Sequence, residues 1–429
     1  MKSVLFIVYY FPPMGASGVQ RPVKFVKYLP EFGWKPIVLT PEPGAYHTFD
    51  HSLMDEVHGK HIQIERVEAN TPFHIGGGKP KEVKIPEKLA AVLRSISQFF
   101  WIPDNKTGWI KPALKKARQI IQSEEHNIDL IYSTAPPYSN HLIAAQLKKE
   151  FGLPVVMDLR DEWLLSPLIS YPTRFHRQKM ARMEKKTLAA ANTVTVINEH
   201  TRKSVADRME GLTDVKEISH GFDPADFEYK SDQLMSNASP STLSLLYSGI
   251  FYGERQPDSF LKAVRLAMDE KPELAQVLDL QFQGGLNKEH EALISELNVQ
   301  DQITNFGYIP HKDAVQNLMK ADVLWFIIGH KTHSDKVTAG KIFEYFGTSK
   351  PILALLPEGS GKTLLKNYGS SYIAPPYDIE EIKQKLFKLY EDWKNEAIPS
   401  PNPSFIAKYN RKNITQELGR LFDKLIGEE

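Results

Sequence analysis

The stretch "TAGKIFEY", residues 338–345, combines residue types that can hold an anion and a diol. Thr338 is suited to cap a helix that starts near Gly340 and Lys341. The first-turn amides and the positive dipole end of such a helix attract negative charge. Glu344, one turn further on, is placed to accept hydrogen bonds from a vicinal diol such as a ribose. Alternatively, Glu344 is exposed or salt-bridged, because a charge on an apolar helix face is costly unless it is paired.

A second cationic candidate follows the apolar run 243–249, which ends at Gly249 in "LLYSGIFYGERQPDS". Arg255 lies in the loop after this run, where a guanidinium can neutralise a phosphate with directed donors. A surface arginine would look the same in the sequence, and both interpretations remain open.

The first apolar run ends in "FPPMGASGVQR", in which Gly15 and Gly18 form a Gly-x-x-Gly loop. Glycines between a strand and a helix let backbone amides approach a phosphate or a sugar. They also simply permit a tight turn. The dinucleotide fingerprint G-x-G-x-x-G is absent here, and "PEGSGKTLL" at 357–365 lacks the spacing of a phosphate-binding loop, so no kinase or ATPase is indicated.

The segment "DLRDEW" places Asp158, Arg160 and Asp161 at the carboxyl end of a predicted core strand. Charged groups there are expected to point into a ligand cleft rather than into the core. They would contact a charged ligand or hold a sugar hydroxyl. The competing interpretation is an Arg–Asp pair that ties the loop.

Residues 79–102 combine five basic residues with an apolar run that ends in two phenylalanines and a tryptophan. This composition favours peripheral contact with an anionic surface, here the inner membrane. A partly buried helix with a solvated face explains the pattern equally well. The basic and aromatic residues do not interleave over a surface long enough for nucleic acid.

The candidate residues above lie in the loops and helix ends between short apolar runs. These runs alternate with helical patterns along the chain. The runs at 4–10, 35–40, 129–134, 154–159 and 193–197 predict buried strands, with helices predicted between them. The same alternation restarts at 243–249 and continues at 278–284, 303–309, 322–328 and 350–356. This α/β pattern predicts parallel sheets with helices on both faces.

The polar stretch 223–242 separates the two α/β halves and is the predicted linker. We therefore expect one domain over 1–222 and another over 243–402. A final helix over 403–429 is expected to pack back on the first domain. Ligands of such sheets bind beyond the carboxyl ends of the strands, which favours a site between the two domains.

Composition limits the class of protein. The chain has 429 residues, 24% of them charged, a formal net charge of +1 and no cysteine. These values exclude a general polyanion binder, disulfides, thiolate catalysis and cysteine zinc sites. The apolar start ends at Pro12-Pro13 without a cleavage signal, and no window reaches the roughly 18 apolar residues of a membrane span. The sequence predicts a soluble cytoplasmic protein, with membrane association through 79–102 as an added possibility.

The ordered set of segments resembles the retaining nucleotide-sugar glycosyltransferases of family 4. The matching segments are "PPMGASGVQR", "WIPDNKTGW", "STAPPYSNHLIA", "DLRDEW", "ISHGFDPADF", "YSGIFYGERQP", "FGYIPHKD" and "GKIFEYFGTSKPI". They span nearly the whole chain and are most similar to bacterial members of polysaccharide assembly that carry an Asp-x-Arg-Asp-x-Trp segment. The resemblance implies a GT-B fold, with two Rossmann-like α/β domains facing a central cleft.

The resemblance also implies residue roles in the second domain. The loop after Gly249 would supply basic residues to the donor diphosphate, and Arg255 is the candidate because Ile250 occupies the position of a second basic residue. The backbone at Tyr308 and Ile309 would hold the nucleobase. Gly340 and Lys341 would face the diphosphate, and Glu344 would bind the ribose hydroxyls.

In the first domain, the resemblance places Gly15 and Gly18 beside the donor diphosphate and the acceptor. Two positions depart from the family pattern. Lys336, with Asp335 beside it, stands where the family usually has a glutamate that touches the donor sugar. Arg160-Asp161 stands where many relatives have a His-Asp pair, so these two residues are the catalytic candidates of the first domain, with Arg255 in the second.

The implied reaction transfers a sugar from a nucleotide diphosphate sugar to a saccharide or lipid-linked saccharide acceptor. Amides, a helix end and Arg255 would stabilise the charge that develops on the leaving group. The family generally needs no metal or other cofactor. Two alternatives remain open: a nucleotide-sugar epimerase of the same fold, which converts its substrate without an acceptor, and a non-catalytic nucleotide-sugar-binding protein.

Overall fold

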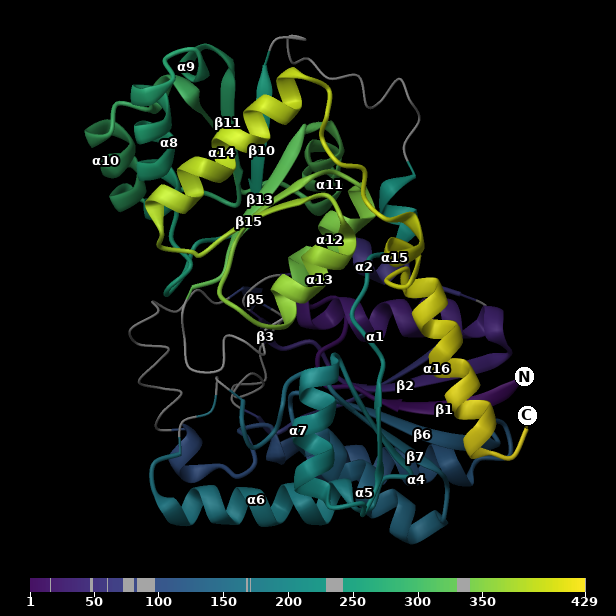
Figure 1. Ribbon diagram of the computed structural model, residues 1–429. Helices are drawn as coiled ribbons and strands as arrows, with labels where there is room; N and C mark the ends of the chain where they lie inside the picture. Colours follow the sequence, from purple (N-terminus) through teal and green to yellow (C-terminus); the bar gives the residue numbers. More distant parts are fainter. Residues whose placement is uncertain are drawn as a thin grey trace. The chain divides into compact units, whose positions relative to one another are not determined.

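The computed structural model describes residues 1–15, 17–46, 49–59, 61–71, 81–82, 97–166, 169, 171–228, 242–329 and 340–428. It divides into two compact units (Figure 1). The first comprises Met1–His220 and Arg411–Glu429, and the second comprises Gly221–Asn410. Among the described residues, no helix is both long and apolar enough to cross a membrane.

The first unit is built on a parallel sheet of seven described strands in the order β4-β2-β1-β6-β7-β8-β9. Their bounds are β1 (Lys2–Ile7), β2 (Trp34–Pro41), β4 (Gln63–Val67), β6 (Ile128–Ala135), β7 (Val155–Leu159), β8 (Thr193–Val196) and β9 (Asp214–Glu217). A separate two-stranded ladder joins β3 (Ala45–Tyr46) and β5 (Lys81–Glu82). The chain order reverses between β1 and β6, so a ligand of this sheet is expected beyond the ends of those two strands.

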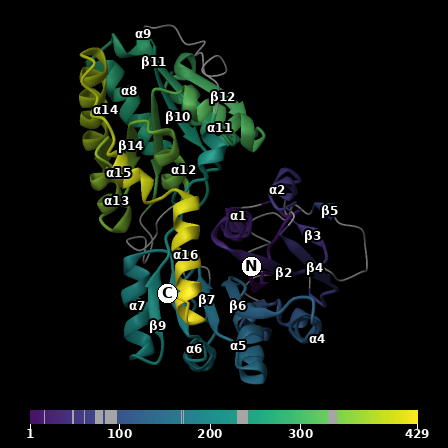
Figure 2. The ribbon, with the colours of Figure 1, turned by 90° about the vertical axis from the view of Figure 1, so that its right-hand side faces the viewer.

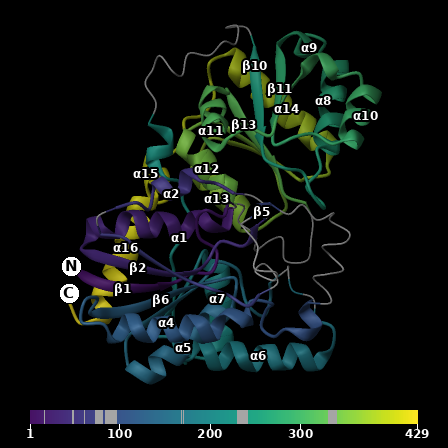
Figure 3. The ribbon, with the colours of Figure 1, turned by 180° about the vertical axis from the view of Figure 1, so that it is seen from behind.

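Helices cover both faces of the first sheet (Figure 3). Their bounds are α1 (Ser17–Tyr28), η1 (Leu29–Phe32), α2 (Ser52–Asp55), η2 (Thr107–Trp109), α4 (Ile110–Gln122), α5 (Ser139–Phe151), α6 (Arg174–Leu188), α7 (Glu199–Met209) and α16 (Arg411–Leu425). Val4 and Phe6 of β1 face the layer of α1 and α16, whereas Leu5 and Ile7 face α4 to α7. Burial of both faces explains why the inner strands of this sheet read as continuous apolar runs.

The second unit has a parallel sheet of six described strands in the order β12-β11-β10-β13-β14-β15. The strands are β10 (Leu243–Ser248), β11 (Leu278–Gln283), β12 (Ile303–Gly307), β13 (Val323–Ile327), β14 (Ile352–Leu355) and β15 (Ser371–Ala374). The helices are η3 (Pro224–Phe227), α8 (Asp258–Glu270), α9 (Leu274–Val277), α10 (Lys288–Glu296), η5 (Gln300–Gln302), α11 (His311–Lys320), α12 (Gly340–Thr348), α13 (Ser360–Tyr368), α14 (Ile379–Lys394) and α15 (Pro403–Ala407). Here the order reverses between β10 and β13.

The end of the chain differs from the prediction of one helix over 403–429. The structure has two helices there, α15 in the second unit and α16 in the first, where it packs beside α1 (Figure 2). The helix is interrupted because the carbonyl of Tyr409 accepts the backbone N–H of Phe222 (2.9 Å), and Asn410 pairs with Phe222. Of the predicted linker, residues 224–227 form η3 within the second unit, and 229–241 lie outside the described residues.

Candidate functional site

Two strand ends of the second unit approach each other so closely that only glycine fits. Gly249, after β10, has a φ of +133° and donates its backbone N–H to the carbonyl of Gln283 (2.6 Å). Gly284, after β11, has a φ of +117°, and a Cβ there would lie 2.4 Å from the carbonyl oxygen of Gly249. Its own N–H donates to Gly307 at the end of β12 (2.7 Å). The ends of three neighbouring strands are therefore joined at the carboxyl edge of the sheet by half-buried glycines, which carry no side chains.

Lys341, in the first turn of α12, reaches this edge. A Cβ on Gly249 would lie 1.8 Å from its Nζ, so the ammonium group occupies the space that a side chain at 249 would take. The same Nζ lies 4.5 Å from the ring centroid of Tyr247 and donates to the Tyr247 hydroxyl (3.4 Å). Burial lowers the pKa of Lys341 to about 8, an effect that Glu344 opposes and Arg255 reinforces.

An aromatic cluster holds the lysine and its helix in place. The Tyr247 ring stacks on Phe251 with centroids 4.1 Å apart, and Trp325 of β13 packs against Tyr247 at 4.9 Å. The Tyr345 hydroxyl accepts the backbone N–H of Ser248 (3.2 Å) and donates to the carbonyl of Trp325 (3.1 Å). This hydroxyl thus joins α12 to both strands at which the chain order reverses.

Glu344 is half-buried on α12, between its buried neighbours Phe343 and Tyr345. Its side chain is 36% exposed, and Oε1 lies 3.9 Å from Nδ1 of His311, the first residue of α11. The other ring nitrogen of His311 lies 3.8 Å from a carboxylate oxygen of Asp226. Glu344 therefore faces the chain that leaves β12, where Tyr308 and Ile309 were predicted to hold a nucleobase. His311, in the segment "FGYIPHKD", is a neighbour of Glu344 that the sequence does not predict, because the two residues are 33 positions apart.

The remaining predicted residues of the second unit lie around this edge. Tyr308 is 80% exposed and Ile309 half-buried, directly after Gly307. Arg255 is half-buried, donates from Nη1 to the Tyr252 hydroxyl (2.6 Å) and lies over the Tyr252 ring. Asp335 and Lys336 lie outside the described residues.

In the first unit, Arg160 is engaged by the backbone rather than open to a ligand. Its guanidinium donates to the carbonyls of Gly18 and Pro136, and only 9% of the residue is exposed. The reason lies in α1, where Pro22 has no N–H to give the Gly18 carbonyl four residues earlier. Arg160 supplies the missing donor. A Cβ on Gly18 would lie 2.8 Å from Nη1, so Gly18 makes room for this contact.

The expectation that the charges of "DLRDEW" avoid the core is wrong for Asp158. This side chain is fully buried and pairs with Arg21 through two hydrogen bonds of 2.8 and 3.1 Å. Thr134 and Thr195 also donate to it, at 2.9 and 2.8 Å. Burial alone would raise the pKa of Asp158, but Arg21 and the threonine hydroxyls outweigh it and lower the pKa to about 2.

Arg21 also donates to the carbonyls of Ile218 and Ser219 and so connects α1, β7 and the chain after β9. The sequence predicts no role for Arg21, because its partner Asp158 is more than a hundred positions away. Gly15 is buried in the loop after β1, and Asp161 is half-buried, with its pKa raised by burial against the opposing effect of Arg160. Gly15, Gly18, Arg160 and Asp161 all lie near the carboxyl ends of β1 and β7.

A second buried cation was missed in the segment "WIPDNKTGW". Lys106 is 2% exposed, its Nζ lies 5.6 Å from the ring centroid of Tyr9, and burial lowers its pKa to about 7. Asp104 accepts the backbone N–H groups of Lys106 (2.9 Å) and Ser139 (3.0 Å) and thereby caps α5. Tyr9 and Ser139 follow β1 and β6, so this group lies at the point where the strand order of the first sheet reverses.

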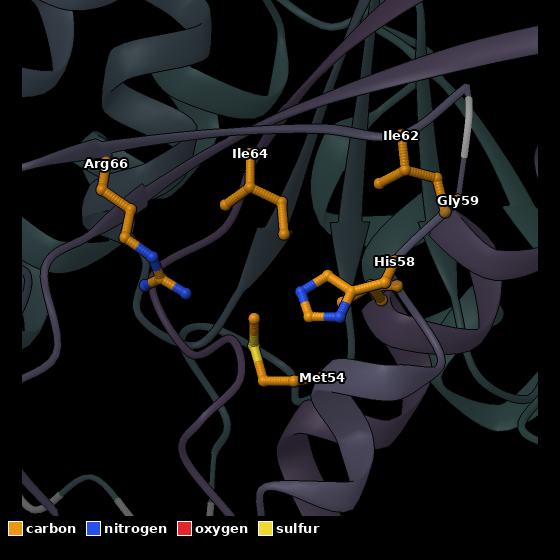
Figure 4. Close-up of a pocket in the computed structure, with 7 residues that line it drawn as sticks. Met54, His58, Gly59, Ile62, Ile64 and Arg66 are labelled. Carbon is orange, nitrogen blue, oxygen red and sulfur yellow. The ribbon is translucent and has the colours of Figure 1, made fainter.

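A surface pocket of about 520 Å³ lies between α2 and β4 in the first unit (Figure 4). Arg66 at one end of it donates to the carbonyls of Pro12 (2.6 Å) and Pro41 (3.0 Å). The pocket is lined by Met54, Val57, His58, Gly59, Ile62, Ile64 and Arg66. None of the predicted site residues is among them. Within the described part of the chain, no three His, Asp or Glu side chains cluster as metal ligands.

Comparison with known proteins establishes the fold. No protein-family model matches the chain, and no curated protein sequence matches it. Among solved structures, sucrose-phosphate synthase from Thermosynechococcus elongatus aligns with a TM-score of 0.61 at 14% identity, over 99% of each chain. Anabaena HepE in complex with UDP aligns with a TM-score of 0.63 at 14% identity, over 99% of this chain and 100% of that one. The trehalose 6-phosphate synthase of Burkholderia multivorans aligns with a TM-score of 0.57 at 10% identity, over 99% and 98%. Together with the two parallel-sheet units, these likenesses show that the chain has the GT-B fold.

Proposed function

We propose that the protein is a glycosyltransferase. It moves a sugar from a nucleotide diphosphate sugar to an acceptor hydroxyl, with retention of configuration, in the biosynthesis of a surface polysaccharide or glycoconjugate. The observation that carries the proposal is the convergence of Lys341, Arg255 and Glu344 on one edge of the second sheet. A fold that holds UDP and UDP-glucose in the Anabaena HepE structures supports this class of donor.

The diphosphate is assigned to the bare backbone at Gly249. Its negative charge is neutralised by Lys341 and Arg255. The first-turn amides of α12, at the positive end of the helix dipole, also donate to it. These groups are in place before the reaction, so they stabilise the negative charge that grows on the leaving group as the glycosidic bond breaks. No side-chain acid is then needed to expel the nucleotide diphosphate.

The nucleoside is assigned to the side of α12 that faces α11. Glu344 accepts hydrogen bonds from the ribose hydroxyls, and the base lies against the chain at Tyr308 and Ile309. The acceptor is assigned to the first unit, near Gly15 and Asp161. Asp335 and Lys336 remain the candidates for contact with the donor sugar.

Calorimetric titration with UDP tests the donor site. Arg255→Ala and Glu344→Gln are each expected to weaken UDP binding about 10- to 100-fold, the range for one lost charge-assisted hydrogen bond. Arg265→Ala is the matched control, because Arg265 lies on α8 of the same unit and pairs with Asp269 four residues away. Unchanged affinity in both site variants would overturn the assignment.

The ribose contact has a sharper test. Because Glu344 is assigned to the hydroxyls, the wild type is expected to bind UDP more tightly than 2′-deoxy-UDP, and Glu344→Gln is expected to lose that preference. An equal preference in both proteins would contradict the role of Glu344.

An activity assay distinguishes the proposed transferase from an epimerase and from a protein that only binds nucleotide sugars. UDP release from a UDP-sugar panel is expected only when a saccharide or lipid-linked acceptor fraction is added, and it is expected to persist in EDTA. Conversion of the donor without an acceptor would indicate an epimerase, and binding without any consumption would indicate a binding protein.

A further inference from the structure

Four large aromatic side chains lie exposed together on the first unit. Phe99, Phe100, Trp101 and Phe175 are 50, 69, 42 and 66% exposed. Ring centroids of Phe99 and Phe100 are 5.2 Å apart, and those of Phe100 and Trp101 are 6.2 Å apart. His176 joins Phe175 to this group, because its ring lies 5.2 Å from Phe99 and 5.9 Å from Phe175. A contiguous exposed apolar patch of this kind usually marks an interaction surface.

The patch continues into the most basic helix of the first unit. α6 has six Lys and Arg residues and one acidic residue, Glu184. Glu184 is buried and pairs with Arg208 (3.1 Å), while Lys185 pairs with Glu210 (2.9 Å). In the described structure the other five cations have no ion pair; they are Arg174, Arg177, Lys179, Arg182 and Lys186.

Helical spacing places aromatic and basic groups on one side of α6. Phe175, Lys179, Arg182 and Lys186 follow one another at intervals of four, three and four residues and are all exposed, whereas Met180 is buried. The helix lies on the outside of the helical layer of its unit (Figure 1). The exposed side of α6 therefore has an aromatic residue, Phe175, at its start, followed by a row of positive charges without ion pairs in the described structure. A single binding partner could contact both.

We propose that this surface, Phe99 to Trp101 with the exposed side of α6, docks on the anionic face of a lipid bilayer. The net charge of the chain is only +1, so the basic character is local to this surface. The surface of a bilayer can bind both kinds of side chain at once. Aromatic rings insert at the level of the lipid headgroups, and Lys and Arg form ion pairs with the lipid phosphates. Of the predicted membrane segment 79–102, residues 79–80 and 83–96 lie outside the described residues, and Phe99 to Trp101 belong to this surface. Phe175 and α6 were not part of that prediction.

The proposal does not depend on the transferase activity and is tested by vesicle co-sedimentation of the full chain. Binding is expected with vesicles of phosphatidylcholine and phosphatidylglycerol, weak binding with phosphatidylcholine alone, and release as salt is raised. The variant Lys179→Gln/Arg182→Gln/Lys186→Gln is expected to lose about a hundredfold in partitioning, since each charge near an anionic surface contributes roughly a fivefold factor. The variant Phe100→Ser/Phe175→Ser is expected to lose tight binding at every salt concentration.

Matched controls lie in the second unit. Lys262→Gln/Lys288→Gln/Lys366→Gln removes the same charge from exposed positions elsewhere, and Leu266→Ser removes an exposed apolar side chain. Both are expected to partition as the wild type does. Because all the altered residues are exposed, unchanged circular dichroism and UDP binding are expected throughout. Equal partitioning of site and control variants, or retention on single-stranded RNA without vesicle binding, would overturn the proposal.

Discussion

At the scale of single residues, Lys341 is the group whose charge matters most for the proposed donor site. The position after Gly249 that could have carried a second cation is Ile250, which is 59% exposed. The ammonium group of Lys341 reaches the same loop from α12 instead. The strand edge thereby keeps its bare backbone and still gains a positive charge.

In the proposed donor site, this arrangement is expected to make UDP affinity depend on pH. In the protein without ligand, the pKa of Lys341 is about 8. A diphosphate bound beside the lysine is expected to raise this pKa. Binding above pH 8 would therefore be coupled to the uptake of a proton by Lys341. Affinity measured by calorimetry is expected to fall by up to about tenfold per pH unit as pH rises above 8. Lys341→Arg, which stays protonated, is expected to lack this fall and serves as the control for ionisation of the nucleotide itself. The same pH dependence in both proteins would contradict the role of Lys341.

Asp158 is expected to govern acid stability. Its pKa in the folded state, about 2, lies below the ordinary value of 3.8, so its contribution to stability is complete above about pH 4 and is lost as pH falls from 4 to 2. Asp158→Asn leaves Arg21 buried without its charge partner and is expected to lower the free energy of unfolding by about 3–5 kcal/mol at neutral pH. Denaturant unfolding of the wild type and variant across this pH range measures both effects. A variant as stable as the wild type at neutral pH would show that the pair is dispensable.

At the scale of elements, α1 depends on a side chain from a distant loop. Pro22 removes the hydrogen bond that would normally hold the carbonyl of Gly18, and Arg160, which follows β7, replaces it. The two residues are therefore expected to be energetically coupled, although they are far apart in the sequence.

A double-mutant cycle tests this coupling. Arg160→Ala alone is expected to lower the free energy of unfolding by about 1–3 kcal/mol, the cost of an unsatisfied buried polar group. In a Pro22→Ala background the N–H of residue 22 satisfies Gly18, and the same substitution is expected to cost at least about 0.5 kcal/mol less. Additive effects in denaturant unfolding would contradict the replacement.

At the scale of the whole molecule, the two ends of the chain meet in the first unit. The core layer of α1 is completed by Ile414, Leu418 and Phe422 of α16. Phe422 packs edge-to-face on Trp34 at 5.3 Å, and the Trp34 indole donates to Asp423 (3.0 Å). The helix α16 is therefore part of the core of the first unit.

Segment-resolved hydrogen exchange tests this role of α16. Phe422→Ala is expected to lower the stability of the first unit by about 3–5 kcal/mol. Exchange should accelerate in β1 and β2 but not in β10 or β13. Phe405→Ala, on α15 of the second unit, is the matched control and is expected to accelerate exchange in β10 and β13 instead. Equal acceleration in both units for either variant would contradict the division.

The sequence by itself determined the α/β class and the places of ten strands, although β12 at the sheet edge is half-buried or exposed rather than buried. Continuous apolar runs arise when both faces of a parallel strand are buried, so these strands could be recognised locally. The edge strands β4, β9 and β15 were missed because half-buried or polar residues interrupt their pattern.

Only the tertiary structure decided what each charged residue contacts. It buries Asp158 against Arg21, turns Arg160 toward a carbonyl freed by Pro22, and brings Lys341 to Gly249 and His311 to Glu344. It also separates α15 from α16. These partners lie between 33 and 142 positions apart, and a charge is held by whichever group the fold brings within a few ångströms. Local patterns record burial and helix ends, but the pairing of charges depends on contacts that form only when the strands and helices have packed.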